Sequence, residues 1–143
     1  MYILDTDHLS LIQRNGEDGK RIIARLASIA NPEVAVTVIT YEEQVKGRLS
    51  VLARAKTIDE QVFAYQGLQQ VAIDYLKIAI LPFSHAAALE HQRLRKAYPR
   101  LGNMDLKIAA ISSTHNALLL TRNKSDFGQI LELRIEDWSI LVK

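Results

Sequence analysis

The chain has 143 residues, of which 48% are hydrophobic and 24% charged, and its formal net charge is +2. This composition is typical of one ordinary globular domain, and so small a charge does not by itself indicate a polyanionic partner. The absence of cysteine excludes thiol catalysis, thiolate metal sites and disulfides, and it fits a reducing cytoplasm. No apolar run approaches the about 20 residues of a membrane helix, so no membrane partner is expected.

Short apolar runs alternate with longer segments of helical periodicity along the chain. The apolar runs predict strands at residues 1–4, 34–39, 78–81, 117–121 and, as a fifth, 133–138. The segments between them predict helices at residues 8–14, 18–30, 40–55, 58–78, 85–98 and 104–115. Strands that alternate with helices favour a mostly parallel sheet with helices on both faces. We therefore expect a single α/β domain over residues 1–143, with four to five strands.

Polar residues that favour the start of a helix precede several of these segments. The expected caps are Thr6 or Asp7, Thr40, Ser84, Asn103 and, for a short helix from Phe127, Asp126. Thr40 also stands three residues before Glu43, the spacing of a capping box.

Acidic residues follow the predicted strands or open the helices after them. They fall in four segments, namely Asp5 with Asp7, Glu42 with Glu43, Asp105, and Asp126. Ligands of an open parallel α/β sheet bind beyond the carboxyl ends of its strands. The predicted sheet therefore gathers these four segments at one edge, although they lie far apart in the sequence.

Each acid taken alone has a simple structural explanation. One of Asp5 and Asp7 can cap a helix, Glu43 can close the capping box with Thr40, and Asp105 and Asp126 suit the positive end of a helix. Together they are harder to explain in this way, because clustered carboxylates raise one another's pKa and destabilise a fold unless a cation neutralises them. Ligands that are all oxygen favour a hard ion, Mg²⁺ or Mn²⁺.

The histidines do not compete as a metal site. They are scattered along the chain with no pair at i, i+4, at positions His8, His85, His91 and His115. We expect each to be a surface or half-buried residue.

Five stretches of the sequence resemble the PIN domain family of the VapC toxin type. They are "ILDTDHLS", "VITYEEQVKG", "LGNMDLKIAA", "LLLTRNKSDF" and "LRIEDW", and together they span nearly the whole chain. The resemblance implies a Rossmann-like sheet and Mg²⁺- or Mn²⁺-dependent cleavage of RNA. It also implies a homodimer and a cognate antitoxin whose tail covers the active site.

The family's acidic positions can be matched one by one. Its first acid corresponds to Asp5, its glutamate to Glu43, and its third acid, which precedes an apolar helix, to Asp105. The fourth position falls on Asn123 in some members and on Asp126 in others. We expect Asp126 to be the catalytic and metal-binding residue, and Asn123 to be a neutral ligand or to hold a water. Position 7 is often Asn in the family and is Asp here.

Further residues receive supporting roles in this hypothesis. Thr6 and Thr121 are expected to donate hydrogen bonds to the acids, and Asp7 to add negative charge. Cations beside the acids could contact RNA phosphates, namely Lys46, Arg48, Arg122 and Lys124. Apolar residues of the first two helices either line a groove for an antitoxin helix or pack on the sheet, and these are Leu9, Leu11, Ile12, Ile22, Ile23 and Leu26.

Two other functions are open at this stage. The "DTD" after an apolar strand also fits a haloacid-dehalogenase-like phosphatase, in which Asp5 would be the nucleophile and Asp7 the acid. Such enzymes usually continue with Gly and Thr, whereas His8 and Leu9 follow here. The other alternative is a non-catalytic binding module of the same fold, which would have lost some of its acids.

Overall fold

The computed structural model describes residues 1–141, so positions 142 and 143 of the predicted domain lie outside the described residues. The strands are β1 (Tyr2–Leu4), β2 (Val34–Thr37), β3 (Ala79–Leu81), β4 (Leu118–Leu120) and β5 (Arg134–Glu136). The helices are α1 (Thr6–Arg14), α2 (Glu17–Ala27), α3 (Val38–Arg54), α4 (Ile58–Asp74), α5 (His85–Ala97), α6 (Asn103–Thr114) and α7 (Lys124–Phe127). The strands form one five-stranded sheet in which every pairing is parallel, which confirms the predicted α/β fold.

The strand order is β3-β2-β1-β4-β5, so the chain moves outward from β1 on one side and later returns to β1 on the other. Loops that leave β1 and β4 therefore turn toward opposite faces, and a crevice opens between their carboxyl ends. Asp5 follows β1 and Thr121 follows β4, which places both at this crevice. The topology thus defines where a ligand site can form before any side chain is considered.

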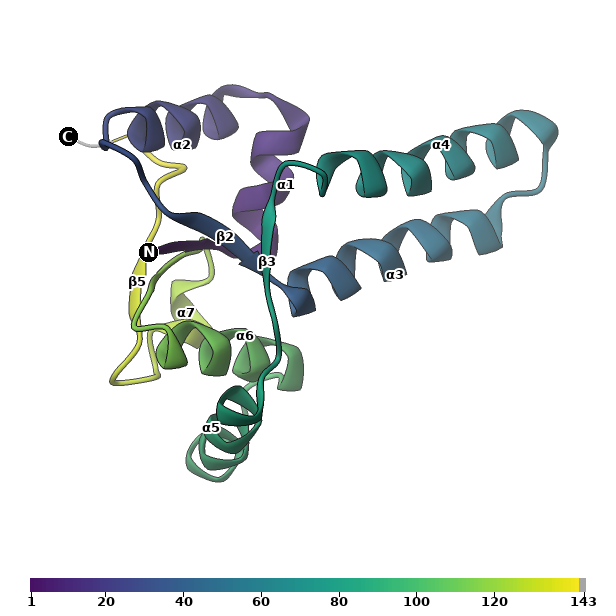
Figure 1. The fold of residues 1–143 in the computed structure, drawn as a ribbon. Coiled ribbons are helices and arrows are strands. Elements are labelled where there is room, and N and C mark those ends of the chain that lie inside the picture. The colour runs from purple at the N-terminus through teal and green to yellow at the C-terminus, as the bar shows by residue number, and fades with distance from the viewer. Residues whose placement is uncertain (142–143) are drawn as a thin grey trace.

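Helices cover both faces of the sheet (Figure 1). Side chains alternate along β1, so Ile3 packs with α5 and α6 whereas Leu4 packs with α1 and α2. Along β4, Leu119 and Leu120 divide between the same two cores. α6 is buried on several sides, as its apolar sequence predicts, and it supplies more residues to the first core than any other element.

The apolar residues of α1 and α2 pack on the sheet and do not form a separate groove. Leu9 and Ile22 are buried in the second core, and Leu11, Ile12 and Leu26 pack against it. Only Ile23 of this group is largely exposed. The alternative of an antitoxin groove lined by these side chains is therefore not supported.

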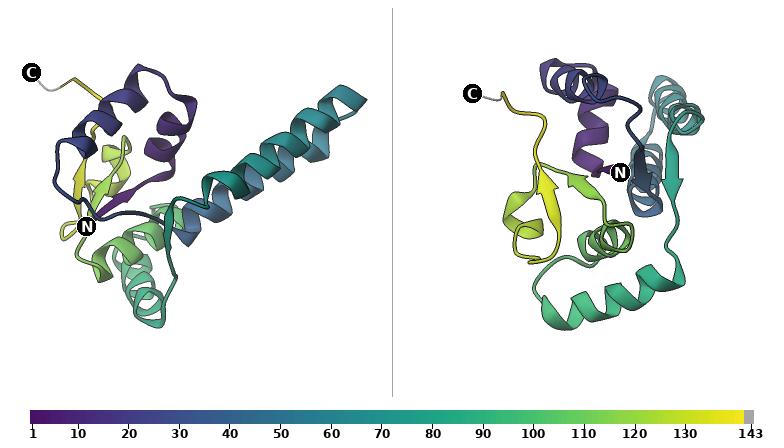
Figure 2. Two further views of the ribbon diagram at one scale, coloured as in Figure 1. Left: turned by 45° about the horizontal axis from the view of Figure 1, so that its top comes forward. Right: turned by 60° about the vertical axis from the view of Figure 1, so that its left-hand side comes forward.

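α3 and α4 form a long antiparallel hairpin that projects from the body of the domain (Figure 1 and Figure 2, left). Much of α4 is exposed because the hairpin extends beyond the sheet (Figure 1). Large exposed apolar side chains lie along it, including Ile58, Val62, Phe63 and Tyr65. Within residues 1–141, no helix is both long and apolar enough to cross a membrane.

Two predicted boundaries around β2 are wrong. The strand ends at Thr37 rather than at residue 39, and α3 begins at Val38 rather than at Thr40. The reason is that the Thr37 hydroxyl caps the helix by accepting a hydrogen bond from the Thr40 amide at 3.2 Å. Thr40 is therefore inside the helix, and the capping box with Glu43 does not form. β-branched residues before a helix favour either state, so the apolar pattern alone could not locate this boundary.

Three other caps also differ from the prediction. Asp5, rather than Thr6 or Asp7, caps α1, and Gly102, rather than Asn103, precedes α6. Asn123 caps α7, so Asp126 lies inside that helix instead of capping one from Phe127. The predicted cap at Ser84 is confirmed, since its side chain accepts a hydrogen bond from the Ala87 amide.

Gly19 allows α1 and α2 to approach closely. A Cβ at this position would meet the Leu11 carbonyl and would lie 3.0 Å from Ile12 Cα. Both contacts are with backbone, which cannot rotate away as a flexible side chain can. Gly47, in the middle of α3, has no atom within 4 Å of its added Cβ.

These two helical glycines should respond to alanine in opposite directions. Gly19→Ala is expected to lower the free energy of unfolding by about 1–3 kcal/mol, because α1 and α2 must separate. Gly47→Ala, as the matched control, should raise it by about 0.5–1 kcal/mol, since alanine is the better helix former. Urea denaturation measures both values. A Gly19→Ala variant as stable as the parent would contradict the close packing of these helices.

Candidate active site

Asp5 sits at the crevice between β1 and β4. Its backbone N–H donates to the Leu120 carbonyl at 2.9 Å, which holds the residue against the end of β4. Its carboxylate accepts from the Thr6 amide at 2.8 Å and from the Thr121 hydroxyl at 2.7 Å. The side chain is buried, with 6% of the residue's surface exposed. These contacts fix both carboxylate oxygens in one orientation.

Glu43 approaches the same place from α3. Its Oε1 accepts a hydrogen bond from the Thr6 hydroxyl at 2.9 Å, and Thr6 Oγ1 also lies 3.1 Å from Thr40 Oγ1. Thr6 thus links the acid of α3 to the start of α1. Glu42 points elsewhere and pairs with Lys46 at 3.3 Å, so it does not replace Glu43 at the site.

Asp105 and Asp126 complete the acidic group from the other half of the chain. Asp105 lies in the first turn of α6 and is partly buried. Asp126 accepts a hydrogen bond from the Asn123 side-chain amide at 3.2 Å, and its own backbone N–H donates to Asn123 Oδ1. Asn123 in turn donates from its backbone to Thr121 Oγ1 at 3.0 Å. This chain of hydrogen bonds connects the fourth acid to the crevice.

The carboxylates act on one another electrostatically. Burial raises the pKa of Asp5 to about 7, with a further contribution from the negative charge of Asp7 and a smaller one from Asp105. The pKa of Asp105 is also raised, first by burial and then by Glu43, Asp126 and Asp7. Acids that are distant in the sequence therefore share one electrostatic environment, as the predicted sheet edge requires.

Along the described residues 1–141, no lysine or arginine neutralises these acids. Among residues 1–141, Asp5, Glu43, Asp105 and Asp126 form no ion pair with a basic side chain. A cluster of carboxylates with raised pKa values and no cationic partner has the donor chemistry for a hard divalent ion.

The distances between these acids limit how an ion could be held. In the part of the chain that the structure describes, no three Asp, Glu or His side chains are grouped closely enough to form a ready-made metal cage. Mg²⁺ does not require such a cage, because it keeps several waters and commonly binds through only one or two carboxylates. The remaining acids would then contact the ion's waters.

Asp7 is held on both sides. Its Oδ2 accepts from the Arg122 backbone amide at 2.9 Å and lies 3.3 Å from the Thr121 hydroxyl, and its Oδ1 lies 2.7 Å from His8 Nδ1. The Trp138 amide donates to His8 Nε2 at 3.1 Å, so Nε2 is the acceptor and Nδ1 is the nitrogen that donates to Asp7. Asp7 is thereby positioned beside Asp5 and adds to its pKa shift.

His8 was missed in the sequence, and the expectation that it is a surface or half-buried residue is wrong. The His8 side chain is fully buried. His91 is also buried, and its Nε2 lies 2.8 Å from Asn103 Oδ1. His8 follows Asp7 directly and opens the buried face of α1, and this is the only signal in the sequence that could have indicated its role. His85 and His115 are exposed.

The four cations proposed to contact RNA differ in their surroundings. Lys46 pairs with Glu42, and Arg122 pairs with Asp18 at 3.7 Å. Lys124 is exposed at the start of α7, and Arg48 lies across Gly67 of α4. All four are at the surface around the acids, and only Arg48 also lines a cleft.

The all-parallel sheet and the acids at its crevice define a nuclease-like α/β domain, and comparison with known proteins supports this class. The PIN domain family model matches residues 2–131. The chain belongs to the PIN domain family.

Relatives of similar length carry a more specific description. The protein "Ribonuclease VapC1" of Haemophilus influenzae strain R2866 is 27% identical over 147 residues, covering 97% of this chain and 98% of that protein. The solved structure of VapBC-1 from nontypeable Haemophilus influenzae has a TM-score of 0.76 at 25% identity, with coverage of 97% and 98%. That of VapBC2 from Rickettsia felis, bound to a DNA fragment from its promoter, has a TM-score of 0.75 at 24% identity, with coverage of 96% and 98%. Because its identity is below 25%, the similarity to VapBC2 supports the fold alone.

The pKa shift of Asp5 predicts how metal-free protein responds to pH. In the unfolded chain Asp5 titrates near its ordinary value of 3.8, whereas in the fold it titrates near 7. The folded state therefore binds the extra proton between these values, and stability falls as the pH rises through this window. Asp5→Asn removes the charge and keeps one oxygen to accept from the Thr6 amide, while its NH₂ group can donate to the Thr121 hydroxyl oxygen. It should therefore be more stable than the parent at pH 8 by about 1–3 kcal/mol.

Denaturation in EDTA at pH 4 and pH 8 measures this effect. Asp59→Asn, at an exposed acid in α4, is the control and should differ little from the parent at either pH. An Asp5→Asn variant that is less stable than the parent at pH 8 would contradict the electrostatic strain assigned to the site.

Removal of the His8 ring should destabilise the fold. His8→Ala leaves a cavity and removes the partners of the Trp138 amide and the Asp7 carboxylate, so the free energy of unfolding is expected to fall by about 2–4 kcal/mol. Trp138 is the single tryptophan and is buried, so its fluorescence follows the transition directly. His115→Ala, at an exposed position, should change stability by less than about 0.5 kcal/mol. Equal losses in the two variants would argue against a structural role for His8.

Proposed function

We propose that this PIN domain is an endoribonuclease, the toxin of a toxin–antitoxin pair, which hydrolyses RNA phosphodiester bonds with Mg²⁺ or Mn²⁺. The observation that carries the proposal is the acidic crevice between β1 and β4, where Asp5 is buried next to Asp7 and electrostatically linked to Asp105. Similarity to Ribonuclease VapC1 along almost the full length of both proteins supports the same activity.

The proposed metal-binding and catalytic residues are Asp5, Glu43, Asp105 and Asp126. A divalent ion bound at such a site would lower the pKa of a water molecule and neutralise part of the negative charge that develops on the phosphate. Asp5 would bind most directly, since its carboxylate is the most buried and the most rigidly held. Glu43 and Asp105 would contribute charge and hold waters from either side, and Asp126 would orient a water from α7.

The supporting residues fix these acids in place. The Thr121 hydroxyl holds Asp5, the Thr6 hydroxyl holds Glu43, and Asn123 holds Asp126. Three of the four acids thus have a hydroxyl or amide partner that donates to their charged form. Such preorganisation reduces the reorganisation needed when a phosphodiester binds. Lys46, Arg48, Arg122 and Lys124 are proposed to contact RNA phosphates around the crevice.

Protein partners form part of the same proposal. The solved VapBC-1 structure is named for two components, and we infer by similarity that this chain pairs with a cognate antitoxin and forms a homodimer. The exposed apolar side chains of the α3–α4 hairpin are consistent with protein contacts, because single domains seldom leave so many uncovered. The RNA substrate implies that the protein acts in the cytoplasm.

The two alternative functions fare differently. Membership of the PIN family argues against a haloacid-dehalogenase-like phosphatase, and the His8 and Arg122 contacts of Asp7 leave it poorly placed as a mobile proton donor. A non-catalytic PIN module would be expected to lose acids, whereas all the matched positions remain acidic. This second alternative becomes the outcome to exclude by experiment.

Adjacent glutamates provide a matched test of the activity. Purified protein is expected to cleave RNA with Mg²⁺ or Mn²⁺ and not with EDTA. Glu43→Gln should lower the cleavage rate by about 100-fold or more, because it removes a charge from the crevice. Glu42→Gln should retain the rate within about threefold, since Glu42 only forms an exposed ion pair with Lys46.

Asp5→Asn extends the same assay. Cleavage that persists in EDTA and in Asp5→Asn would exclude the proposed site, and the lack of any cleavage by the parent protein with either metal would favour the non-catalytic module.

A further inference from the structure

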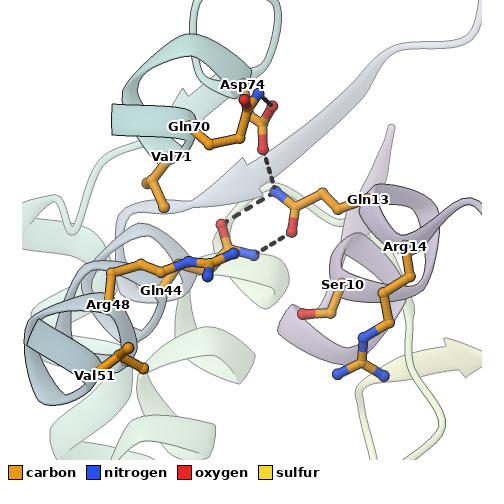
Figure 3. A pocket seen from close by; sticks show the side chains of 10 residues that line it. Ser10, Gln13, Arg14, Gln44, Arg48, Val51, Gln70, Val71 and Asp74 are labelled. Atoms are coloured by element: carbon orange, nitrogen blue, oxygen red, sulfur yellow. Dashed lines mark hydrogen bonds between the residues drawn. The ribbon is translucent and has the colours of Figure 1, made fainter. Parts of the chain in front are cut away.

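A polar cleft lies between α1 and the α3–α4 hairpin, beside the acids but separate from them. Its volume is about 600 Å³. Ser10, Gln13 and Arg14 line it from α1, Arg48 lines it from α3, and Asp74 lies at the end of α4 (Figure 3). Polar side chains predominate among the lining residues, and Val51 and Val71 add an apolar part.

The cleft and the acidic site share the helices α1 and α3. On α1, Thr6, Ser10 and Arg14 are spaced four residues apart and share one face, and Thr6 contacts Glu43. Arg14 therefore lies about 12 Å along the helix from Thr6, the length of three to four stacked nucleotides. On α3, the cleft residue Gln44 directly follows Glu43. A polymer bound at the acids would run into this cleft.

Two arginines in the cleft have no anionic partner. Within residues 1–141, neither Arg14 nor Arg48 forms an ion pair. The one carboxylate that lines the cleft, Asp74, instead accepts hydrogen bonds from Gln13 at 3.0 Å and from Gln70 at 2.8 Å. The guanidinium groups are thus available to a ligand, whereas the acid is already occupied.

Arg48 is held by a specific feature of α4. A Cβ added at Gly67 would lie 2.8 Å from Arg48 Nη1 and 3.3 Å from its Cδ. The glycine therefore leaves the space in which the arginine side chain lies against α4. This explains a helix-weakening glycine in the middle of a 17-residue helix, where alanine would otherwise be preferred.

We propose that this cleft, through Arg14 and Arg48, binds backbone phosphates of the RNA strand beyond the bond that is cleaved. The inference rests on the proposed function and names where its substrate lies. Guanidinium groups match phosphate oxygens with paired hydrogen bonds, and the cleft is lined by the helices α1 and α3 that also carry Thr6 and Glu43. An acidic peptide of a protein partner would also meet arginines here, but the helices shared with the acidic crevice favour the strand that is cleaved.

Binding of RNA by a cleavage-deficient protein tests the proposal. Anisotropy of a fluorescent single-stranded oligoribonucleotide is measured with Asp5→Asn protein and Mg²⁺. Adding Arg14→Gln or Arg48→Gln should weaken binding by about 3- to 10-fold each. Each substitution should also reduce the slope of log affinity against log salt by about 0.7, the loss of one phosphate contact on a single strand. Arg54→Gln, at the far end of the same helix α3, is the matched control and should change neither value by as much as half these amounts.

Gly67→Leu separates a binding effect from unfolding. Leucine is a good helix former, so α4 should be kept, but its side chain occupies the place of Arg48. The affinity for RNA should fall to the level of Arg48→Gln, with an unchanged circular dichroism spectrum and thermal midpoint. RNA affinity equal to the parent's in Arg14→Gln, Arg48→Gln and Gly67→Leu would overturn the proposal.

Different experimental results would contradict this inference and the proposed function. If the arginine variants bind RNA normally but lose affinity for the antitoxin, the cleft belongs to the protein partner, and the proposal is wrong although cleavage still depends on Asp5. If cleavage does not depend on Asp5 or on metal, the proposed function itself is wrong.

Discussion

The site depends on one unfavourable arrangement: the Asp5 carboxylate is buried next to the carboxylate of Asp7, after the central strand β1. Burial and the neighbouring charge raise the pKa of Asp5 to about 7, so the ionised form is costly in the metal-free protein. No lysine or arginine of the described chain relieves this cost at Asp5. A divalent cation would lower this cost. The carboxylates that destabilise the metal-free fold are therefore the same ones that are proposed to carry the chemistry.

Hydroxyl and imidazole groups hold these carboxylates in position by hydrogen bonds. Thr121 and Thr6 each tie an acid to a neighbouring element, and His8 ties Asp7 to the backbone at Trp138. These residues come from α1, β4 and the segment after β5, so the site is assembled from both ends of the chain. The strand order makes this possible, because β1 lies between β2 and β4. Acids that are about 100 positions apart in the sequence therefore face one crevice.

Much of the fold could be predicted from the sequence because its three central strands, β1, β2 and β4, are short, apolar and largely buried, and its helices have clear periodicity. Sequence could also indicate Asp5, which follows a strand, and Asp105, which opens a helix. Glu43 was indicated as well, although it lies in the second turn of α3 and not at its start. It could not locate the start of α3, where Thr37 and Thr40 are both suitable caps and only the hydrogen bond between them decides. Whether these acids carry catalysis stays a prediction.

Features that depend on tertiary contacts were beyond the sequence. The buried role of His8 requires the C-terminal segment to return over α1, and local patterns do not specify this. The exposure of α4 arises because the hairpin extends past the sheet, although the helix itself was predicted. Gly67 weakens α4 by its low helix propensity, and only the position of the Arg48 side chain against it gives this glycine a structural reason. In each case a long-range contact decides the outcome.

The most direct test of the central claim is the anomalous diffraction of Mn²⁺ in crystals of the protein. The account predicts an anomalous peak in the crevice between β1 and β4, bound to the Asp5 carboxylate, with Asp105 and Glu43 at direct or water-mediated distance. The same crystals of Asp5→Asn protein should show a much weaker peak or none. A peak that lies elsewhere, or an empty crevice at saturating Mn²⁺ in the parent protein, would contradict the claim that these carboxylates form a cation site.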